Sequence, residues 1–409
     1  MSENNINVPK IRFPGFTDAW ERRKLEEVAS YRNGRAHEKD ISDSGDFVVV
    51  NSKFVSTNGQ IKKFANKQIE PLEKDEIAFV LSDVPNGKAI ARTFLVPESN
   101  KYSLNQRIAG ITPFDNTDPY FLSELMNRHH YFLRFDDGVG QTNLSKKDVE
   151  DFEEFYPAVE EQQKIGSFFK QLDHLITLHQ RKLNHLQDEK KSLLQKMFPK
   201  NGADVPEIRF PGFTHAWEQR KLGKVVDVVK SYSLSRDVET DEDSGFRYVH
   251  YGDIHKKVAD LIESAEQLPM IKAGDYDLLQ KGDVIVADAS EDYIGIAEPS
   301  VLLDTPSDKV VAGLHTIAMR PKETTPLFLY YLLHTDDFKK FGGRVGTGMK
   351  VFGITTKNLF KYPAVLPIKE EQEKIGKFFY ELDHLITLHQ RKLEHLQKQK
   401  KSLLQQMFV

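Results

Sequence analysis

The feature of this sequence that most constrains its fold is an internal duplication. The twelve residues LDHLITLHQRKL stand at Leu172–Leu183 and again, without a substitution, at Leu382–Leu393. A second matched pair opens the two halves, with PKIRFPGFTDAWERRKLEEV at Pro9–Val28 and PEIRFPGFTHAWEQRKLGKV at Pro206–Val225. Much of the sequence between these matched ends has diverged. We therefore expect two related units that share repeated elements but differ in the segments between them.

A heptad pattern surrounds each copy of the twelve-residue repeat. Residues that are apolar except for one histidine and one lysine in each copy recur at alternating spacings of four and three from Ile165 to Met197 and again from Ile375 to Met407. This a/d pattern predicts two long helices, and two near-identical seams in one chain favour pairing with each other as a coiled coil. Each helix could instead lie on its own domain. In an antiparallel pair Leu172 would face Lys400, whose ammonium group would reach past the apolar seam to water.

The segments between the matched ends predict a mixed α/β fold. Short β-rich runs such as Phe47–Val50 and Val284–Val286 are separated by turns rich in Gly, Asn, Ser and Asp, and helical segments follow around Tyr120–Arg134 and Leu327–Phe341. We expect two globular α/β domains separated by two long helices that form an antiparallel coiled coil. The expected bounds are 1–157 for the first globular domain, 158–200 for the first long helix, 201–367 for the second globular domain and 368–409 for the second long helix.

Composition and charge exclude several classes of protein. The 409 residues contain no cysteine, which excludes disulfides and thiolate metal sites. The formal net charge of −4 argues against a protein that coats nucleic acid by charge alone, although not against local basic loops. The first residues lack the pattern of a signal peptide, and the apolar runs are too short to cross a membrane. We therefore expect a cytoplasmic protein with no membrane partner.

Two motifs adjoin the expected long helices. The aromatic RFPGF motif of each half either anchors a globular domain on its helix or offers rings on which DNA bases stack, and we favour the anchor. The acidic pairs Glu160–Glu161 and Glu370–Glu371 stand where each long helix begins. Carboxylates there complement the positive end of a helix dipole, which we favour over acid/base chemistry.

The chain resembles the specificity subunit of a type I restriction–modification enzyme. The resemblance rests on RFPGFT-x-AWE-x-RKL at the start of each half, and on G-x-G…P…EEQ-x-KIG before each long helix, at Gly138–Gly166 and Gly346–Gly376. It covers essentially the whole chain. It implies two target recognition domains that read a bipartite, asymmetric site in double-stranded DNA, spaced by two conserved helices. It also implies two copies of an adenine methyltransferase subunit and a restriction subunit that translocates DNA as partners.

The same resemblance implies that catalysis lies in the partner subunits, so that this chain has no catalytic residue and no cofactor. The sequence agrees, because it has no NPPY-like or DPPY-like adenine methylase motif and no G-x-x-x-x-G-K-[ST] phosphate loop. Two alternatives stay open: a free-standing DNA methyltransferase or nuclease, and a duplicated coiled-coil scaffold without a role on DNA. Asp83 and Asp288–Asp292 could suggest a nuclease, but no second acidic strand with a following lysine is convincingly placed.

Candidate DNA contacts are polar loops at corresponding places in the two halves. Arg can form two hydrogen bonds to guanine, and Asn or Gln two to adenine. In the first half the candidates are Arg32, Asn33, Arg35, Asn51, Lys53, Ser82, Asn86, Lys88, Asn105, Gln106, Arg107, Gln141, Thr142 and Asn143. In the second half they are Tyr232, Ser233, Arg236, His250, Tyr251, Asp253, Ser290, Tyr293, His315, Arg344, Thr347 and Lys350. Any one of them could instead be a solvated loop residue or a turn former.

Apolar residues outside the a/d seam are candidate partner contacts. A seam alone does not need them, so they pack against the chain's own domains or dock a partner, and the resemblance favours a partner. The candidates are Phe168, Leu175, Leu178, Phe378, Leu385 and Leu388. The histidines of the long helices, by contrast, are spaced at five and six positions, which scatters them around the helix. We expect no metal site.

Overall fold

The computed structural model describes residues 8–37, 39–200, 202–291, 295–304, 308–348 and 352–408. The chain divides into two compact units: unit 1 is Met1–His179 with Lys392–Val409, and unit 2 is Gln180–Arg391. The long helices are α5 (Val159–Lys196) and α11 (Lys369–Met407), so each unit contains a segment of both. Both helices were predicted from the heptad pattern, and both begin six residues before the first seam isoleucine.

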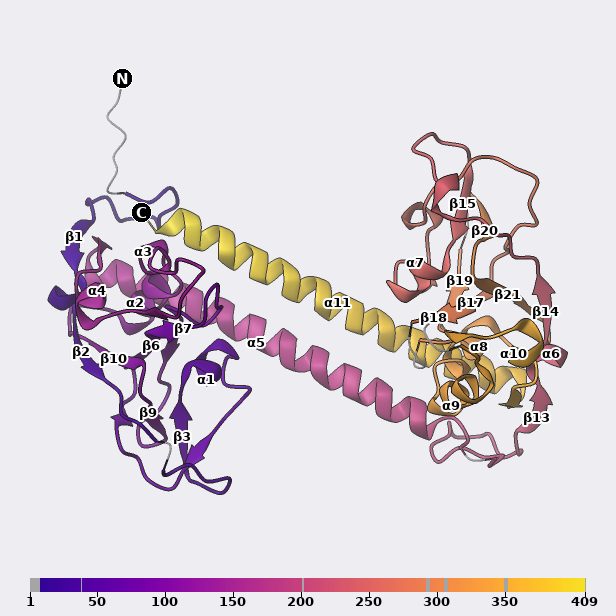
Figure 1. Ribbon diagram of the computed structural model, residues 1–409, viewed down its shortest axis with the longest axis horizontal. Coiled ribbons are helices and arrows are strands. Elements are labelled where there is room, and N and C mark those ends of the chain that lie inside the picture. The colour runs from indigo at the N-terminus through magenta and orange to yellow at the C-terminus, as the bar shows by residue number, and fades with distance from the viewer. Residues whose placement is uncertain are drawn as a thin grey trace. The chain divides into compact units, whose positions relative to one another are not determined.

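Unit 1 is built on two four-stranded sheets (Figure 1). The first has the order β2 (Ala29–Asn33), β10 (Ile108–Pro113), β6 (Ile77–Val80) and β8 (Thr93–Leu95), and every pair in it is antiparallel. The second has the order β4 (Phe64–Ala65), β3 (Phe47–Val50), β9 (Tyr102–Leu104) and β5 (Pro71–Leu72), with β3 parallel to β9. Two short antiparallel pairs complete the unit: β1 (Glu21–Lys24) with β12 (Glu153–Tyr156), and β7 (Ser82–Asp83) with β11 (Thr142–Asn143).

Short helices connect the strands of unit 1. They are η1 (Leu25–Glu27), α1 (Ser52–Ser56), α2 (Pro119–Met126), α3 (His130–Leu133) and α4 (Lys146–Glu150). Helix α2 begins with Pro119 directly after Asp118, whose carboxylate accepts the Phe121 N–H at 2.8 Å. A proline at the first position and an aspartate cap are typical of a helix start. The buried face of α2 packs in one core with Trp20, Phe169 of α5 and Leu396 of α11.

Unit 2 repeats the four-strand order of the first sheet of unit 1 and adds a fifth strand, parallel to its neighbour, at one edge. Its main sheet has the order β14 (Val226–Val229), β21 (Thr316–Pro321), β17 (Val284–Ala287), β19 (Pro299–Leu302) and β16 (Leu261–Ile262). The remaining strands form three pairs: β15 (Phe246–Val249) with β20 (Lys309–Ala312), β13 (Glu218–Lys221) with β23 (Pro363–Leu366), and β18 (Ala289–Ser290) with β22 (Phe352–Gly353). The first of these is parallel, as β3 with β9 is in unit 1. The prediction of a mixed α/β fold in two related halves is confirmed.

The helices of unit 2 follow the same order along the chain. They are α6 (Leu222–Val225), η2 (Arg236–Val238), α7 (Tyr251–His255), η3 (Ala265–Gln267), α8 (Pro326–Leu332), α9 (Asp336–Val345) and α10 (Thr356–Leu359). Helix α8 again starts at a proline, and its Phe328, Leu329, Tyr330, Tyr331 and Leu332 are all buried. Among the residues described above, no helix is long and apolar enough to cross a membrane.

The segments of α5 and α11 run antiparallel within each unit. In unit 1 the Phe169 and Phe408 rings are 6.1 Å apart, and one turn further along α5, Asp173 pairs with Lys400. In unit 2 Phe198, just after α5, lies 6.1 Å from Phe379. Lys190, two turns earlier in the chain, pairs there with Asp383 of α11, four positions beyond Phe379. Residue numbers therefore increase along α5 in the direction in which they decrease along α11, within each unit.

The seam lysines are held by carboxylates rather than reaching to water as expected. Lys400 Nζ lies 2.7 Å from Asp173 Oδ2 and 2.9 Å from Glu124 Oε1, and its side chain is 17% exposed. In unit 2 Lys190 Nζ lies 2.6 Å from Asp383 Oδ1. The aspartate in each case belongs to the repeated LDHL segment, so the repeat supplies the counter-charge for the lysine of the other helix.

The RFPGF motif anchors each globular part on its long helix, as predicted. In unit 1 Arg12 donates two hydrogen bonds to Glu161 at 2.7 and 2.8 Å, and Phe13 packs edge-on against Phe168. In unit 2 Arg209 makes the same bidentate contact with Glu371, at 2.6 and 2.7 Å. Glu161 and Glu371 lie in the first turn of their helices and are buried, and each is neutralised by this guanidinium.

Candidate nucleic-acid interface

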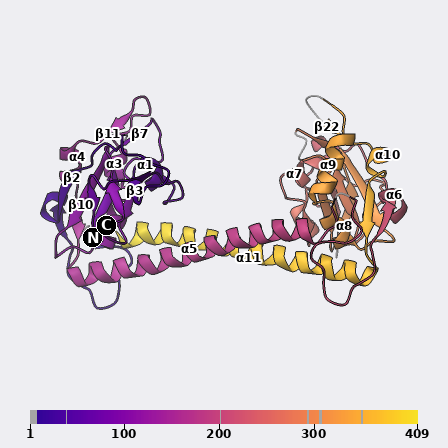
Figure 2. The same ribbon diagram turned by 90° about the horizontal axis from the view of Figure 1, so that it is seen from below.

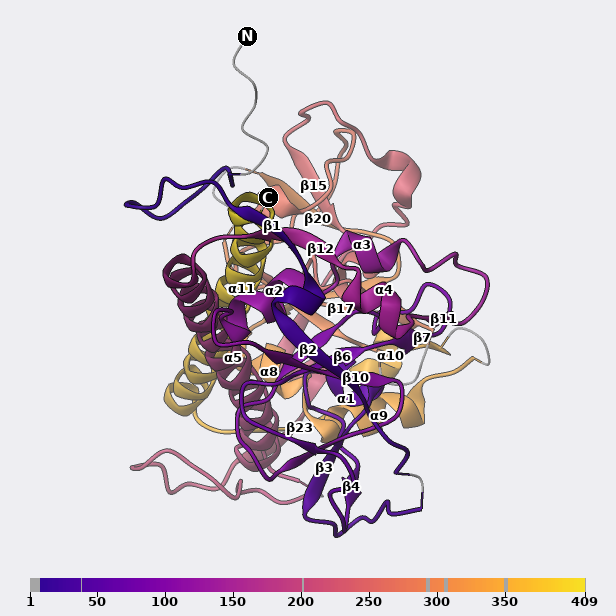
Figure 3. The same cartoon turned by 90° about the vertical axis from the view of Figure 1, so that its left-hand side faces the viewer.

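Four of the predicted DNA-contacting residues of unit 1 come together at the β7–β11 pair. Thr142 lies opposite Asp83 and Asn143 opposite Ser82, and Gln141 Nε2 donates to Ser82 Oγ at 2.7 Å. Ser82 and Thr142 are buried, whereas Gln141 and Asn143 are exposed. Figures 2 and 3 both show this pair on the side of unit 1 that faces away from α5.

The turn that follows β7 is held rigid by its own aspartate. The Asp83 carboxylate accepts the N–H groups of Val84, Ala89 and Ile90 at 2.9, 2.5 and 3.0 Å. Asn86 has a φ of +53°, and a Cβ on Gly87 would collide with the Asp83 carboxylate. Asp83 therefore organises the loop. The loop leaves the side chains of Asn86 and Lys88 exposed.

The turn after β9 displays Gln106 and Arg107, which are both exposed. Arg107 has a φ of +66°, and the Gln106 N–H donates to the Arg35 carbonyl at 3.0 Å. The matching turn of unit 2 carries His315, with a φ of +55°. A side chain larger than glycine in this left-handed conformation costs free energy, and such strain is concentrated at functional sites. Each turn thus exposes a nitrogen-containing side chain, Arg107 in unit 1 and His315 in unit 2, on a residue with a strained backbone conformation.

Other predicted residues of unit 1 have roles inside the fold. Arg32 forms bidentate hydrogen bonds with the buried Glu76, at 3.0 and 2.9 Å, and also pairs with Glu70. Asn51 caps α1 by accepting the Phe54 N–H at 2.9 Å. Asn105 is half-buried beside Arg35. The exposed side chains that remain on this unit are Asn33, Arg35, Lys53, Asn86, Lys88, Gln106, Arg107, Gln141 and Asn143.

In unit 2 several predicted residues contact one another or their own backbone. Arg236 pairs with the buried Asp253 at 2.7 Å. His250 is also buried and accepts the Gly252 N–H at the start of α7; burial, reinforced by the charge of Arg236, lowers the pKa of its ring. The Tyr232 hydroxyl accepts the Asp277 N–H at 2.7 Å.

The remaining predictions in unit 2 divide between exposed and buried positions. Ser290 is buried in β18, and the Tyr251 ring lies 5.3 Å from that of His315. His315 Nδ1 lies 3.0 Å from Asp288 Oδ1. Ser233, His315, Arg344 and Thr347 are exposed. Two further predicted residues, Tyr293 and Lys350, lie outside the described residues.

A comparison with protein families decides what these units are. The family described as "Type I restriction modification DNA specificity domain" matches residues 17–188 and 215–398, one match in each half. This chain belongs to that family.

Individual members of this specificity family are similar along much of the chain. The MjaVIII type I restriction enzyme specificity subunit of Methanocaldococcus jannaschii is 24% identical over 302 residues, which is 70% of this chain and 68% of that protein. The putative MjaX specificity subunit of the same organism is 20% identical over 423 aligned positions, covering 97% and 95% of the two chains.

Solved structures of this family show the same fold. A type I restriction–modification S subunit from M. genitalium covers 98% of this chain and 99% of its own, with a TM-score of 0.64 and 15% identity. A chain from a study of complex assembly and conformational transition of the type I R-M system covers 97% and 98%, with a TM-score of 0.51 and 19% identity.

The candidate partner contacts on the long helices are exposed where the repeat is identical. Leu175 and Leu178 are 43% and 54% exposed, and Leu385 and Leu388 are 45% and 56% exposed. Phe168 is half-buried against Phe13, and Phe378 likewise lies 5.8 Å from Phe210. These two phenylalanines thus pack at least partly on the chain's own RFPGF motif.

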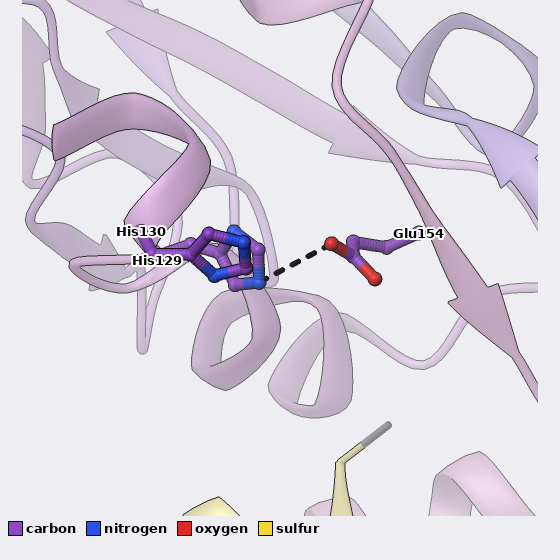
Figure 4. Close-up of side chains that lie close together, drawn as sticks. All are labelled: His129, His130 and Glu154. Atoms are coloured by element: carbon purple, nitrogen blue, oxygen red, sulfur yellow. Dashed lines mark ion pairs between the residues drawn. The ribbon is translucent and has the colours of Figure 1, made fainter. Parts of the chain in front are cut away.

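Folding also assembles a group of side chains that the sequence did not suggest. Ligand atoms of His129, His130 and Glu154 all lie within 4.8 Å of one another in unit 1 (Figure 4). These donor types suit zinc. However, His129 Nδ1 accepts the Tyr131 N–H at 3.3 Å, which leaves the proton of the neutral ring on Nε2, 3.4 Å from Glu154 Oε1. Burial lowers the pKa of His129 to about 4, so its ring is neutral. Both ring nitrogens already face groups of the chain: Nδ1 accepts the Tyr131 N–H, and Nε2 lies beside Glu154.

Proposed function

We propose that this chain is the subunit that reads a bipartite, asymmetric DNA site for a type I restriction–modification complex. Each unit would contact one half-site through the exposed polar loops described above. Arg107 and His315 occupy matching turns but differ in chemistry. The observation that carries the proposal is this shared topology with different exposed side chains at the same places. Direct contacts to base edges are the means by which such loops would select sequence.

The two long helices would form one antiparallel coiled coil that sets the spacing between half-sites. Support comes from the antiparallel packing inside each unit and from the uninterrupted course of α5 and α11. In this proposal the target recognition domains span 1–157 and 201–367, and the conserved spacer helices span 158–200 and 368–409. Half-site spacing is set by protein geometry in DNA readers generally.

Catalysis would belong to partner subunits. Two copies of an adenine methyltransferase subunit would dock on the repeated helix surface, because Leu175 and Leu178 are exposed in one copy and Leu385 and Leu388 in the other. A restriction subunit that translocates DNA would complete the complex. A surface present twice in identical sequence suits two copies of one partner.

The proposal is tested by mapping methylated adenines in DNA from cells that carry this chain with its methyltransferase. We expect one bipartite motif with two different half-sites. Replacing residues between the RFPGF and EEQ-x-KIG elements of one half by those of another family member should change one half-site and leave the other intact. Methylation without a bipartite motif, or a change in both half-sites, would contradict the proposal.

A further inference from the structure

Two arginines of unit 1 donate hydrogen bonds to backbone carbonyls of the turn that follows β7. Arg92 Nε donates to the Lys88 carbonyl at 2.6 Å. Arg128 Nη1 donates to the carbonyls of Gly87 and Ile90, each at 3.2 Å. Both guanidinium groups therefore contact the backbone of the same four-residue segment, 87–90. Both arginines are half-buried, and the neighbouring side chains of Asn86 and Lys88 are exposed.

The charge of these two arginines is not neutralised by the chain. Their hydrogen-bond acceptors are neutral carbonyls, and no carboxylate in the part of the chain that the structure describes forms an ion pair with either. Burial lowers the pKa of Arg92, and the nearby charge of Arg128 lowers it further. Each guanidinium has five N–H donors, so most of them are left unused by the turn.

The backbone around this pair is strained at several residues. Asn86, Ala91 and Arg128 have φ values of +53°, +57° and +58°, and the Arg128 N–H donates to the Ala91 carbonyl at 2.7 Å. Unfavourable conformations of non-glycine residues persist where the surrounding structure holds them, and they cluster at ligand sites. The two guanidinium groups therefore lie at a turn with several residues in the left-handed conformation.

At the residues that the structure describes, unit 2 repeats one backbone feature of this turn but differs in charge. Ala297 has a φ of +56°, and its N–H donates to the end of β17, as that of Ala91 does to the end of β6. The next residue is Glu298 in unit 2, where unit 1 has Arg92. Glu298 is neutralised by Lys257 Nζ at 2.5 Å, and His334 Nε2 lies at 3.5 Å. At this place unit 2 therefore has a carboxylate that is neutralised by ion pairs. Unit 1 has two arginines that form no ion pair with a carboxylate among the described residues.

We propose that Arg92 and Arg128 bind a phosphodiester group of the DNA backbone beside the half-site read by unit 1. This inference rests on the proposed function, because the ligand is the DNA that unit 1 would read. Arginine forks suit phosphate oxygens, and such contacts fix the position of a protein on the duplex without selecting bases. The exposed side chains of Lys88 and Asn86, in the same turn, would then be placed against the groove.

The deciding variant is Arg92→Gln, which keeps an N–H donor for the Lys88 carbonyl but removes the charge. With the full chain bound to its methyltransferase and to the mapped duplex, we expect affinity to fall by about tenfold at low salt. The slope of log affinity against log salt should fall by about 0.9, the value for one lost phosphate contact. Preference for the correct half-site over a mismatched one should stay unchanged, and Arg92→Lys should restore most of the slope.

Lys101→Gln is the matched control, because Lys101 already pairs with Glu98 at 2.6 Å. We expect it to leave the slope unchanged. Scanning the duplex with neutral methylphosphonates locates the contact: the wild type should lose affinity at one or two phosphates beside half-site 1, and Arg92→Gln should be insensitive there. An unchanged slope and scan in a folded Arg92→Gln protein would overturn the phosphate site alone. Absence of sequence-selective binding by the wild-type complex would overturn the proposed function as well.

Discussion

Lys400 of the second long helix donates a hydrogen bond to Asp173 of the first at 2.7 Å, inside unit 1. The reciprocal pair, Lys190 with Asp383, lies inside unit 2. Each long helix thus contributes one aspartate and one lysine to these two pairs. The charged residues of the repeat have a structural purpose that fixes which faces of the helices meet.

The first prediction concerns the unequal surroundings of these two lysines. Lys400 also neutralises Glu124, which is 9% exposed, whereas Lys190 has one carboxylate partner. Lys400→Met should lower the free energy of unfolding by about 3 kcal/mol, because it leaves a buried carboxylate unpaired. Lys190→Met should cost less, because both aspartates keep a tyrosine hydroxyl but only Lys400→Met also leaves Glu124 without its cation. Urea unfolding of both variants checks the order, and equal losses would contradict it.

The second prediction concerns the buried anchor between Arg12 and Glu161. Arg12→Met should destabilise unit 1 by about 3–5 kcal/mol, because Glu161 would stay buried without a cation. Adding Glu161→Gln should recover part of that loss, which a double-mutant cycle measures. Strict additivity of the two changes would show that the pair does not act as a unit.

The third prediction concerns the pH dependence of unit 2. Burial alone would raise the pKa of Glu298, but hydrogen bonds and charges from His334 and Lys257 outweigh it and hold this pKa well below the usual 4.5. A depressed carboxyl pKa stabilises the folded state above pH 4.5, and that stability is lost as the pH falls. Wild type should therefore exceed Glu298→Gln in unfolding free energy at pH 7, with the gap closing towards pH 3. The exposed Glu291→Gln should show no such trend.

The fourth prediction separates a reading residue from a structural one. Arg107→Ala should weaken binding to the mapped site by about 1–3 kcal/mol and relax selectivity at one half-site. It should leave the melting temperature nearly unchanged, because the side chain is exposed. Arg32→Ala should instead lower the melting temperature, because it leaves Glu76 buried and unpaired. Binding titrations and thermal unfolding of both variants test this contrast, and unchanged selectivity in Arg107→Ala would remove that residue from the interface.

The fifth prediction concerns the exposed leucines of the repeat. The double change Leu175→Gln with Leu178→Gln should alter stability by no more than about 1 kcal/mol, since both side chains face solvent. It should reduce co-purification of the methyltransferase. Ile61→Gln, at a residue of similar exposure on unit 1, serves as the control. Normal retention of the methyltransferase by the double variant would exclude this surface as its docking site.

Local patterns in the sequence predicted the elements that depend on local periodicity. The heptad pattern predicted α5 and α11, and the repeated RFPGF motif predicted the anchors. The candidate site was harder to predict from the sequence, because the exposure of a side chain depends on partners that are far away in the sequence. Arg32 looked like a DNA contact until the fold placed Glu70 and Glu76 beside it. Arg92 and Arg128 carry no motif, and only the turn at 87–90 brings them together.

The reciprocal lysine–aspartate pairs also couple the lengths of the two helices. Seventeen positions separate Asp173 from Lys190, and the same seventeen separate Asp383 from Lys400. An insertion between the aspartate and the lysine of only one helix would make the two spacings unequal. Both ion pairs could then no longer form at the same time. A helix pair of this kind can lengthen or shorten only when both copies of the repeat change together. The two globular halves are free to diverge in sequence and in length, whereas the spacing between the charged residues of the two long helices is tied.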